Sequence, residues 1–281
     1  LRQVGKTHTA ERYVTVMNSF GRFRRENELL WEEVDSDLMV EYETYLKSRG
    51  VCPNTSSYYM RGLRAIYNRA VEKGMTVQRE PFKYVYTGID KTIKRAVPLK
   101  VIRQIRDLDL TLFPTMDFAR DIFMFSFYTR GMSFIDMAYL KKKDLQGGTL
   151  SYRRQKTGQQ LFVKWEKPMQ EIVDKYNTNG TPYLLPIIRD MNADIRRQYK
   201  NAAHLVNDKL KKLGEKLGLT VPLTSYVARH GWASIARSRN IPLAIISEAM
   251  GHDSEKTTRI YLASLDTTSV DKANSRILKA L

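Results

Sequence analysis

Residues near the C-terminal end of the chain have types and spacing suited to chemistry on a phosphate ester. Arg229 directly precedes His230, Gly251 and His252 follow about twenty residues later, and Tyr261 comes nine residues after His252. A phosphodiester is anionic, so attack at phosphorus requires cationic donors, and the planar guanidinium of arginine can donate two hydrogen bonds at once. A tyrosine hydroxyl can act as a covalent nucleophile when its developing charge is stabilised. The pattern therefore favours covalent chemistry at phosphorus.

These residues belong to three motifs, at positions 224–230 (TSYVARH), 249–254 (AMGHDS) and 256–261 (KTTRIY). In order and spacing, the motifs resemble the tyrosine recombinase family of phage integrases, Xer-type recombinases and conjugative-transposon integrases. Residues 130–136 (RGMSFID) and 226–230 look most similar to integrases of Bacteroides-type mobile elements. The resemblance covers essentially the whole chain. It implies a mainly α fold with a small β-sheet, in which a helical, SAM-like core-binding domain precedes a mixed α/β catalytic domain.

The resemblance also implies a role for each matching residue. Tyr261 is expected to cut and rejoin DNA through a 3′-phosphotyrosyl bond, Arg229 to clamp the scissile phosphate, and His252 to donate to a phosphate oxygen. Lys156 resembles the general-acid lysine that the family carries on a β-hairpin, and it would protonate the leaving deoxyribose oxygen. Because the covalent link stores the phosphodiester energy and protein cations take the place of a metal, we expect no cofactor.

The first departure from the family pattern is Ser133, which occupies the place of the first family arginine. A neutral serine cannot replace a guanidinium. Arg154 lies two residues before Lys156, and strand alternation predicts that both side chains share one face. Arg130 lies one helical turn before Ser133 and could also reach the phosphate. We favour Arg154 as the substitute, with Arg130 as the alternative, and both could contribute.

The second departure is Tyr226, which stands where the family usually has a histidine, three residues before Arg229. On a helix the two residues share a face, so the Tyr226 hydroxyl could donate a hydrogen bond, although it cannot carry imidazolium charge. His230 lies about 100° around the helix from Arg229, and we expect it to have a structural role.

The elements that must position these residues follow from the apolar spacing. In residues 1–88 it predicts three helices, which begin near Thr9, after Asp35 and at Pro53. Residues 89–97 have little periodicity and indicate a linker, so we expect domains at 1–88 and 98–281. Residues 150–154 and 160–163 flank a turn near Gly158 and predict a β-hairpin. Helices are also predicted at 99–108, 115–128, 190–217, 224–238, 242–250 and 254–264, and residues 267–281 have helical spacing that suits docking on a neighbouring subunit or on the chain's own core.

The composition agrees with a partner that is a polyanion. The chain has 281 residues, 47 Lys and Arg against 30 Asp and Glu, and a net charge of +17. Nucleic acid is the commonest partner of such a protein, although a ribosomal or membrane-surface protein can have the same balance. The larger share of the excess falls in residues 98–281, where we expect the larger phosphate-binding surface.

The single cysteine, Cys52, excludes an intramolecular disulfide framework and a cysteine-based zinc site, which suits a reducing cytosol. The sequence shows neither a bilayer-spanning apolar run nor a signal peptide. The chain starts at Leu1 without an initiator Met, which suggests a fragment or a processed chain, and the sequence leaves open whether an arm-type DNA-binding domain preceded Leu1. The expected place of action is the bacterial cytoplasm, at the nucleoid.

We expect the two domains to form a C-shaped clamp around double-stranded DNA. The family resemblance implies staged cleavage of four strands by four protomers through a Holliday junction, and accessory DNA-bending proteins could be further partners. One alternative is a type IB topoisomerase, which uses similar chemistry as a monomer. Another is a DNA-binding relative that has lost catalysis, as Ser133 and Tyr226 would allow.

Overall fold

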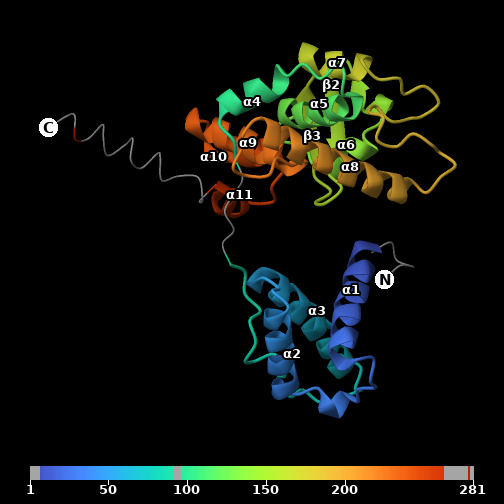
Figure 1. Cartoon of the computed structure of the whole chain (residues 1–281), viewed down its shortest axis with the longest axis vertical. Coiled ribbons are helices and arrows are strands. Elements are labelled where there is room, and N and C mark those ends of the chain that lie inside the picture. The colour runs from blue at the N-terminus through green and yellow to red at the C-terminus, as the bar shows by residue number, and fades with distance from the viewer. Residues whose placement is uncertain (1–6, 91–95, 263–277, 279–281) are drawn as a thin grey trace. The chain divides into compact units, whose positions relative to one another are not determined.

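The computed structural model describes residues 7–90, 96–262 and 278, and the chain divides into two compact units, Leu1–Thr92 and Ile93–Leu281 (Figure 1). The predicted fold class, mainly helical with one small sheet, is confirmed. Residues 91–95 of the predicted linker and nearly all of the predicted tail helix at 267–281 lie outside the described residues.

The first unit contains the three predicted helices, α1 (Thr7–Arg24), α2 (Ser36–Ser48) and α3 (Pro53–Glu72), with a 3₁₀ turn at Trp31–Glu33. Asp35 caps α2, because its side chain accepts a hydrogen bond from the backbone N–H of Leu38 at 2.8 Å. Proline is favoured at the first position of a helix, where its missing N–H has no intrahelical partner, and Pro53 starts α3 in this way.

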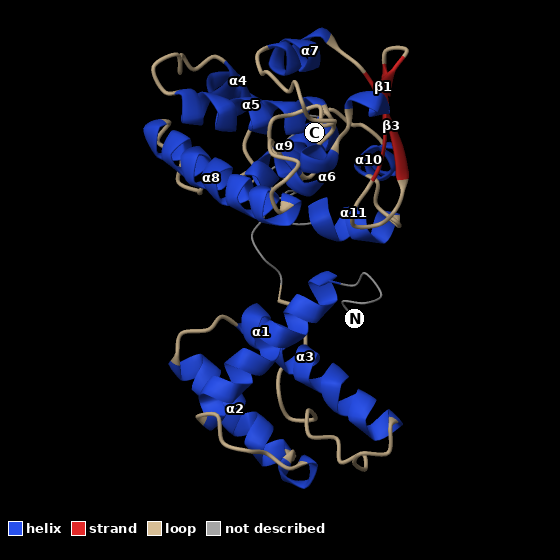
Figure 2. Cartoon of the chain, turned by 90° about the vertical axis from the view of Figure 1, so that its right-hand side faces the viewer, coloured by secondary structure: helices blue, strands red, loops and turns tan. Residues whose placement is uncertain are grey.

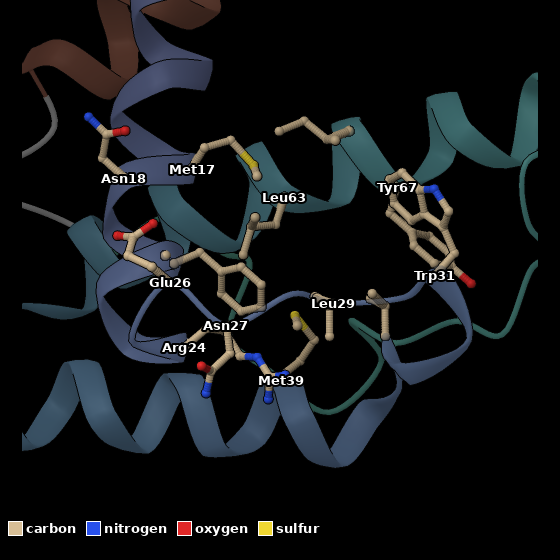
Figure 3. A pocket seen from close by; sticks show the side chains of 14 residues that line it. Met17, Asn18, Arg24, Glu26, Asn27, Leu29, Trp31, Met39, Leu63 and Tyr67 are labelled. Atoms are coloured by element: carbon tan, nitrogen blue, oxygen red, sulfur yellow. The ribbon is translucent and has the colours of Figure 1, made fainter.

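The three helices enclose a core of aromatic and aliphatic side chains, in which Tyr42 is fully buried and donates to Ser19 at 2.7 Å. Burial raises the pKa of Tyr42 to about 12. Next to this core lies a cavity of about 460 Å³, lined mainly by apolar side chains that include Trp31, Leu63 and Tyr67 (Figure 3). The motifs described above lie in the other unit.

The second unit is built around α5 (Pro114–Tyr128), which carries Ile122, Phe123 and Phe125 with no exposed surface. A helix that is apolar on most of its circumference must be covered on several sides. The helices that pack against α5 are α4 (Leu99–Arg106), α7 (Lys167–Asp174), α8 (Ile195–Lys216) and α9 (Ser225–Ser238).

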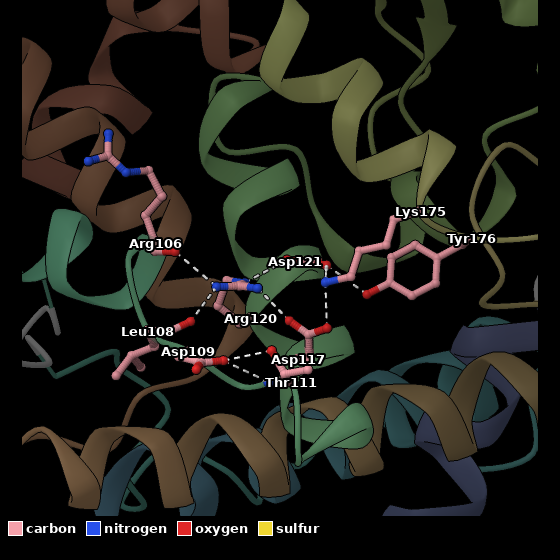
Figure 4. Close-up of polar contacts among 9 residues, drawn as sticks. All are labelled: Arg106, Leu108, Asp109, Thr111, Asp117, Arg120, Asp121, Lys175 and Tyr176. Carbon is pink, nitrogen blue, oxygen red and sulfur yellow. Dashed lines mark hydrogen bonds and ion pairs between the residues drawn. The ribbon is translucent and has the colours of Figure 1, made fainter.

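A polar cluster at the solvent end of α5 ties neighbouring segments together (Figure 4). Arg120 donates to the carbonyls of Arg106 and Leu108 at 2.9 and 3.0 Å, and so holds the end of α4. Asp121 accepts from Tyr176 at 2.7 Å and pairs with Lys175 at 2.8 Å, and so holds the segment after α7. The hydrogen-bond donors and acceptors of this cluster pair with one another, which indicates that the cluster stabilises the fold.

The sheet has three antiparallel strands in the order β1 (Leu145–Gln146), β2 (Thr149–Arg153) and β3 (Gln160–Lys164), and β2 and β3 form the predicted hairpin. The prediction that strand alternation places Arg154 and Lys156 on one face is wrong. The strand β2 ends at Arg153, so both residues lie in the connection between the strands, where Arg154 is buried and Lys156 is exposed.

The remaining elements are α6 (Phe134–Tyr139), α10 (Leu243–Met250) and α11 (Glu255–Leu262). The helix expected from residue 190 begins instead at Ile195. The side chain of Gln198 accepts from the backbone N–H groups of Arg189 and Asp190, and this keeps the segment before the helix in a turn. Within the part of the chain that the structure describes, no helix is long and apolar enough to cross a membrane.

Candidate active site

Arg229 lies in α9 with only 4% of its surface exposed. The helix begins at Ser225, whose backbone N–H donates to the side chain of Asn207 on α8 at 2.9 Å. Nη1 of Arg229 donates to the carbonyl of Gly131 at 2.7 Å, and Nη2 donates to the carbonyl of Met250 at 2.7 Å. A buried charge is tolerated only when it is hydrogen-bonded, and these two carbonyls fix the plane of the guanidinium.

His252 lies in the loop after α10, which Gly251 ends with a left-handed backbone at φ 62°, as the sequence predicted. Its Nε2 lies 3.0 Å from Nη2 of Arg229, and its Nδ1 lies 2.7 Å from Oγ1 of Thr258. A guanidinium can only donate, so Nε2 accepts. The proton of the neutral ring therefore sits on Nδ1, which donates it to Thr258.

The pKa of His252 is lowered to about 4, first by burial and then by the charges of Arg229, Arg154 and Lys156. Burial in a medium of low polarity and nearby positive charge both disfavour an imidazolium. His252 is therefore neutral at pH 7. Its surroundings hold three cationic side chains, which come from α9 and from the connection between β2 and β3.

Arg154 is the second buried arginine of this region, with 7% of its surface exposed. Its Nη1 donates to the carbonyl of Gly251, which brings the hairpin beside the end of α10 (Figure 2). The carbonyl before it, on Met250, accepts from Arg229. The end of α10 thus holds both arginines through consecutive carbonyls, where the partial negative charge of a helix C-terminus favours cations.

Asp136 on α6 is a residue that the sequence analysis did not include in the site. Its side chain is 1% exposed, and Oδ2 lies 3.7 Å from Nε of Arg154. Ser133 donates to Oδ2 at 2.6 Å, and the backbone N–H of Gln155 donates to Oδ1 at 2.8 Å. One carboxylate therefore joins α6, Arg154 and the turn that carries Lys156. The available signal was an acidic residue inside the otherwise apolar stretch 132–140.

The other candidate residues have different surroundings. Lys156 is exposed, yet close enough to the imidazole described above to lower its pKa. Arg130 has a left-handed backbone at φ 61°, and its Nη1 donates to the carbonyl of Phe162 at 3.1 Å. Tyr226 is 52% exposed, and its ring packs edge-on against that of the buried His230, with centroids 4.6 Å apart.

Two glycines allow the close packing of the arginines. A Cβ on Gly131 would lie 2.8 Å from Cα of Arg229, and a Cβ on Gly251 would lie 2.6 Å from Cδ of Arg154. Both residues also have a positive φ, which side chains other than glycine adopt only at a cost.

Tyr261 lies in α11, and its side chain is outside the described residues. Thr258, three residues earlier, is fully buried against His252, and Leu262 packs in a cluster with Ile246 and Met250. The region therefore combines buried guanidinium donors and a neutral imidazole with a helix that carries a tyrosine, a set suited to an anionic substrate.

Comparison with known proteins identifies the family. The chain matches the model of the phage integrase SAM-like domain over residues 1–91 and that of the phage integrase family over residues 114–268. It is 23% identical to the tyrosine recombinase XerA of Pyrococcus horikoshii, over 82% of this chain and 90% of the relative. It is 25% identical to the tyrosine recombinase XerC of Syntrophus aciditrophicus, over 92% of this chain and 87% of the relative.

Two solved structures share the fold. One is the XerH site-specific recombinase bound to a palindromic difH substrate, with a TM-score of 0.71 and 14% identity over 94% of this chain and 78% of that one. The other is a lambda integrase dimer bound to a COC′ core site, with a TM-score of 0.66 and 14% identity over 91% of this chain and 71% of that one. The family model at residues 114–268 spans more than half of the sequence, and the chain therefore belongs to the phage integrase family of site-specific DNA recombinases.

Proposed function

We propose that this recombinase cleaves one DNA strand with Tyr261, holds it as a 3′-phosphotyrosyl intermediate and joins it to a second strand. The observation that carries the proposal is the grouping of Arg154, Arg229 and His252 at the end of α10, against which Thr258 holds α11. Preorganised donors of this kind stabilise the charge that develops on the non-bridging oxygens during attack at phosphorus.

In the cleavage step, the phenol oxygen of Tyr261 forms a bond to phosphorus, and the bond from phosphorus to the 5′ oxygen of the next nucleotide breaks. Lys156 gives a proton to this leaving oxygen, and the phenolic proton passes to solvent. In the joining step, the amine of Lys156 takes the proton from an incoming 5′ hydroxyl, whose oxygen attacks phosphorus and displaces the Tyr261 phenolate, and the phenolate takes a proton from solvent. One phosphodiester is exchanged for another, so the cycle needs no external energy source.

Arg154 is the proposed substitute for the arginine that is absent at Ser133. It is buried beside His252 and donates to the carbonyl adjacent to the one that holds Arg229. Arg130, the alternative, donates to the Phe162 carbonyl on the hairpin. A small rotation of the Arg154 side chain is enough to exchange a carbonyl for a phosphate oxygen, because both are acceptors.

Asp136 is proposed to position both cations of the hairpin. Its carboxylate pairs with Arg154 and accepts from the backbone next to Lys156, so it fixes the start of the turn. Tyr226 is proposed to donate its hydroxyl to the substrate from the surface of α9, on which half of its side chain is exposed.

The proposed organisation is a core DNA-binding domain at residues 1–88, a linker at 89–97 and a catalytic domain at 98–281. Lambda integrase, which has a similar fold, was solved as a dimer bound to a core site and also as a tetramer bound to a Holliday junction, which supports double-stranded DNA and further copies of this chain as partners. We further propose integration of a bacterial mobile element in the cytoplasm, with accessory DNA-bending proteins.

The proposal is tested with a pool of nicked duplexes of randomised sequence, in which cleavage releases a short strand and traps the intermediate. Wild-type protein is expected to yield adducts that survive denaturing detergent, and sequencing of the trapped DNA gives the preferred site. The Tyr261→Phe variant keeps its fold and should yield none.

The outcomes also separate the competing functions. Binding of the pool without any adduct would indicate a relative that has lost catalysis. Adducts combined with relaxation of a supercoiled plasmid that lacks the selected site would indicate a topoisomerase instead. Strand exchange only between two copies of the selected site supports the recombinase.

A further inference from the structure

Thr258 is a buried hydroxyl in a position that the proposed chemistry does not use. It has no exposed surface, and its Oγ1 lies 2.7 Å from Nδ1 of His252. It is carried by α11, three residues before Tyr261, whereas His252 lies in the loop after α10. This hydrogen bond therefore connects the helix of the nucleophile to the imidazole at the phosphate site.

In the structure, His252 is an acceptor toward Arg229. Nη2 of Arg229 lies 3.0 Å from Nε2 and can only donate, so the ring proton is on Nδ1 and points at Thr258. A phosphate oxygen at the same place can only accept. For His252 to donate to that oxygen, its proton must be on Nε2, and Nδ1 must then become the acceptor.

A hydroxyl is suited to this exchange because it is both a donor and an acceptor, and its hydrogen rotates freely. When Nδ1 carries the proton, Oγ1 of Thr258 accepts it. When Nε2 carries the proton, the Thr258 hydroxyl turns and donates to Nδ1. A backbone carbonyl in the same place could pair with only one of the two tautomers, and a carboxylate would favour the charged ring.

We infer that Thr258 is a positioning residue, which lets His252 change from an acceptor toward Arg229 to a donor toward the scissile phosphate. This inference rests on the proposed function. The same hydrogen bond ties α11, the helix that contains residue 261, to the loop that carries His252. Packing of Leu262 with Ile246 and Met250 holds the next turn of α11, so loss of the hydroxyl disturbs the site without releasing the helix.

The test compares Thr258→Val, which keeps the shape and removes the hydroxyl, with Thr258→Ser, which keeps the hydroxyl and removes a methyl group. Thr257→Val is the matched control, because Thr257 is the neighbouring threonine of α11 and is exposed. The first measurement is the ¹⁵N spectrum of histidine-labelled, DNA-free protein, which distinguishes a protonated from an unprotonated ring nitrogen. Only four histidines contribute, so His252 can be assigned with a His252→Asn variant.

We expect a protonated Nδ1 at His252 in DNA-free wild type and in all three variants, because Nη2 of Arg229 still donates to Nε2. In the non-reacting Tyr261→Phe protein bound to a duplex, the proton should move to Nε2, and it should remain on Nδ1 when Thr258→Val is added to this protein. Adduct formation should fall roughly ten- to hundredfold in Thr258→Val, because the buried acceptor Nδ1 is left without a donor, and much less in the other two variants.

The two proposals fail in different ways. Movement of the proton to Nε2 on DNA in spite of Thr258→Val, together with wild-type adduct rates in Thr258→Val, would show that only the shape of Thr258 matters, and this inference would be overturned while the recombinase proposal stood. Absence of adducts from wild type would overturn the proposed function, and the spectra of the DNA-bound Tyr261→Phe proteins would still decide whether Thr258 lets the tautomer change.

Discussion

Gly251 provides a quantitative test of how the two arginines are held, because an added methyl group at this position has two separable costs. The first is the backbone: Gly251 has φ 62°, and the left-handed region costs an alanine about 1–2 kcal/mol. The second is contact, since the new Cβ would lie 2.6 Å from Cδ of Arg154 and 2.9 Å from Cδ1 of Leu161. Overpacking of this kind costs a further amount of about 1–3 kcal/mol.

Gly218 is the matched control. It follows the end of α8 with φ 65°, and an added Cβ would meet no atom within 4 Å. Gly218→Ala should therefore lower the free energy of unfolding by about 1–2 kcal/mol. Gly251→Ala should lower it by about 2–5 kcal/mol, which is the sum of the two costs. Urea denaturation followed by tryptophan fluorescence measures both values.

The activity of these variants separates stability from positioning. The simplest relief for Gly251→Ala is displacement of the Arg154 side chain, which breaks its hydrogen bond to the carbonyl of residue 251. Loss of one preorganised donor to the transition state costs about 10²–10³ in rate, so adduct formation should fall by about that factor at a temperature where the variant is folded. Gly218→Ala should react like wild type. Equal stabilities and equal rates for the two variants would refute the close approach of Arg154 to the end of α10.

Two further predictions concern charge at the site. Arg154→Ala should reduce adduct formation by about 10²–10³, as expected for a transition-state donor, whereas Arg130→Ala should change it only a few-fold. Single-turnover assays of both variants measure these losses. A larger loss in Arg130→Ala would show that Arg130, and not Arg154, replaces the missing arginine. The folded-state pKa of His252 is about 4, below the ordinary value of 6.5, so between these pH values the unfolded chain binds more protons. His252 contributes its full stabilisation above pH 6.5, and this contribution is lost as the pH falls toward 4. The loss is roughly 1–2 kcal/mol, a value reduced for solvent screening because the ring is only partly buried. His252→Asn should flatten that part of a urea-midpoint profile against pH, and an unchanged slope would count against the lowered pKa.

The local parts of the structure were predictable because their signals are local. Asp35 caps the first turn of α2, Pro53 occupies the first position of α3, and Gly251 ends α10 with a left-handed backbone. The hairpin followed from strand-forming residues on both sides of Gly158. The six-residue α6 was not predicted, since it is too short to show a helical period.

The contacts that build the site could not be read from the sequence because they join distant segments. Arg154 and Gly251 are 97 residues apart, and Arg229 and Gly131 are 98 apart. The sequence pointed to Arg154 through strand alternation, which does not apply beyond Arg153. The observed position of Arg154 depends instead on backbone carbonyls at the end of α10. Every residue has a backbone carbonyl, so the sequence carries no signal for such a contact.

Charge balance explains why a serine at position 133 goes together with a buried arginine on the hairpin. The carboxylate of Asp136 is 1% exposed, and a charge in that position needs both hydrogen bonds and a counter-charge. Ser133 supplies a hydrogen bond at 2.6 Å and also caps α6, but it supplies no charge. Arg154 supplies the charge, with its Nε 3.7 Å from the same oxygen, Oδ2, that accepts from Ser133. An arginine at 133 and an arginine at 154 would be alternative ways to balance the same buried acid, so the missing family residue and its proposed substitute are linked through Asp136.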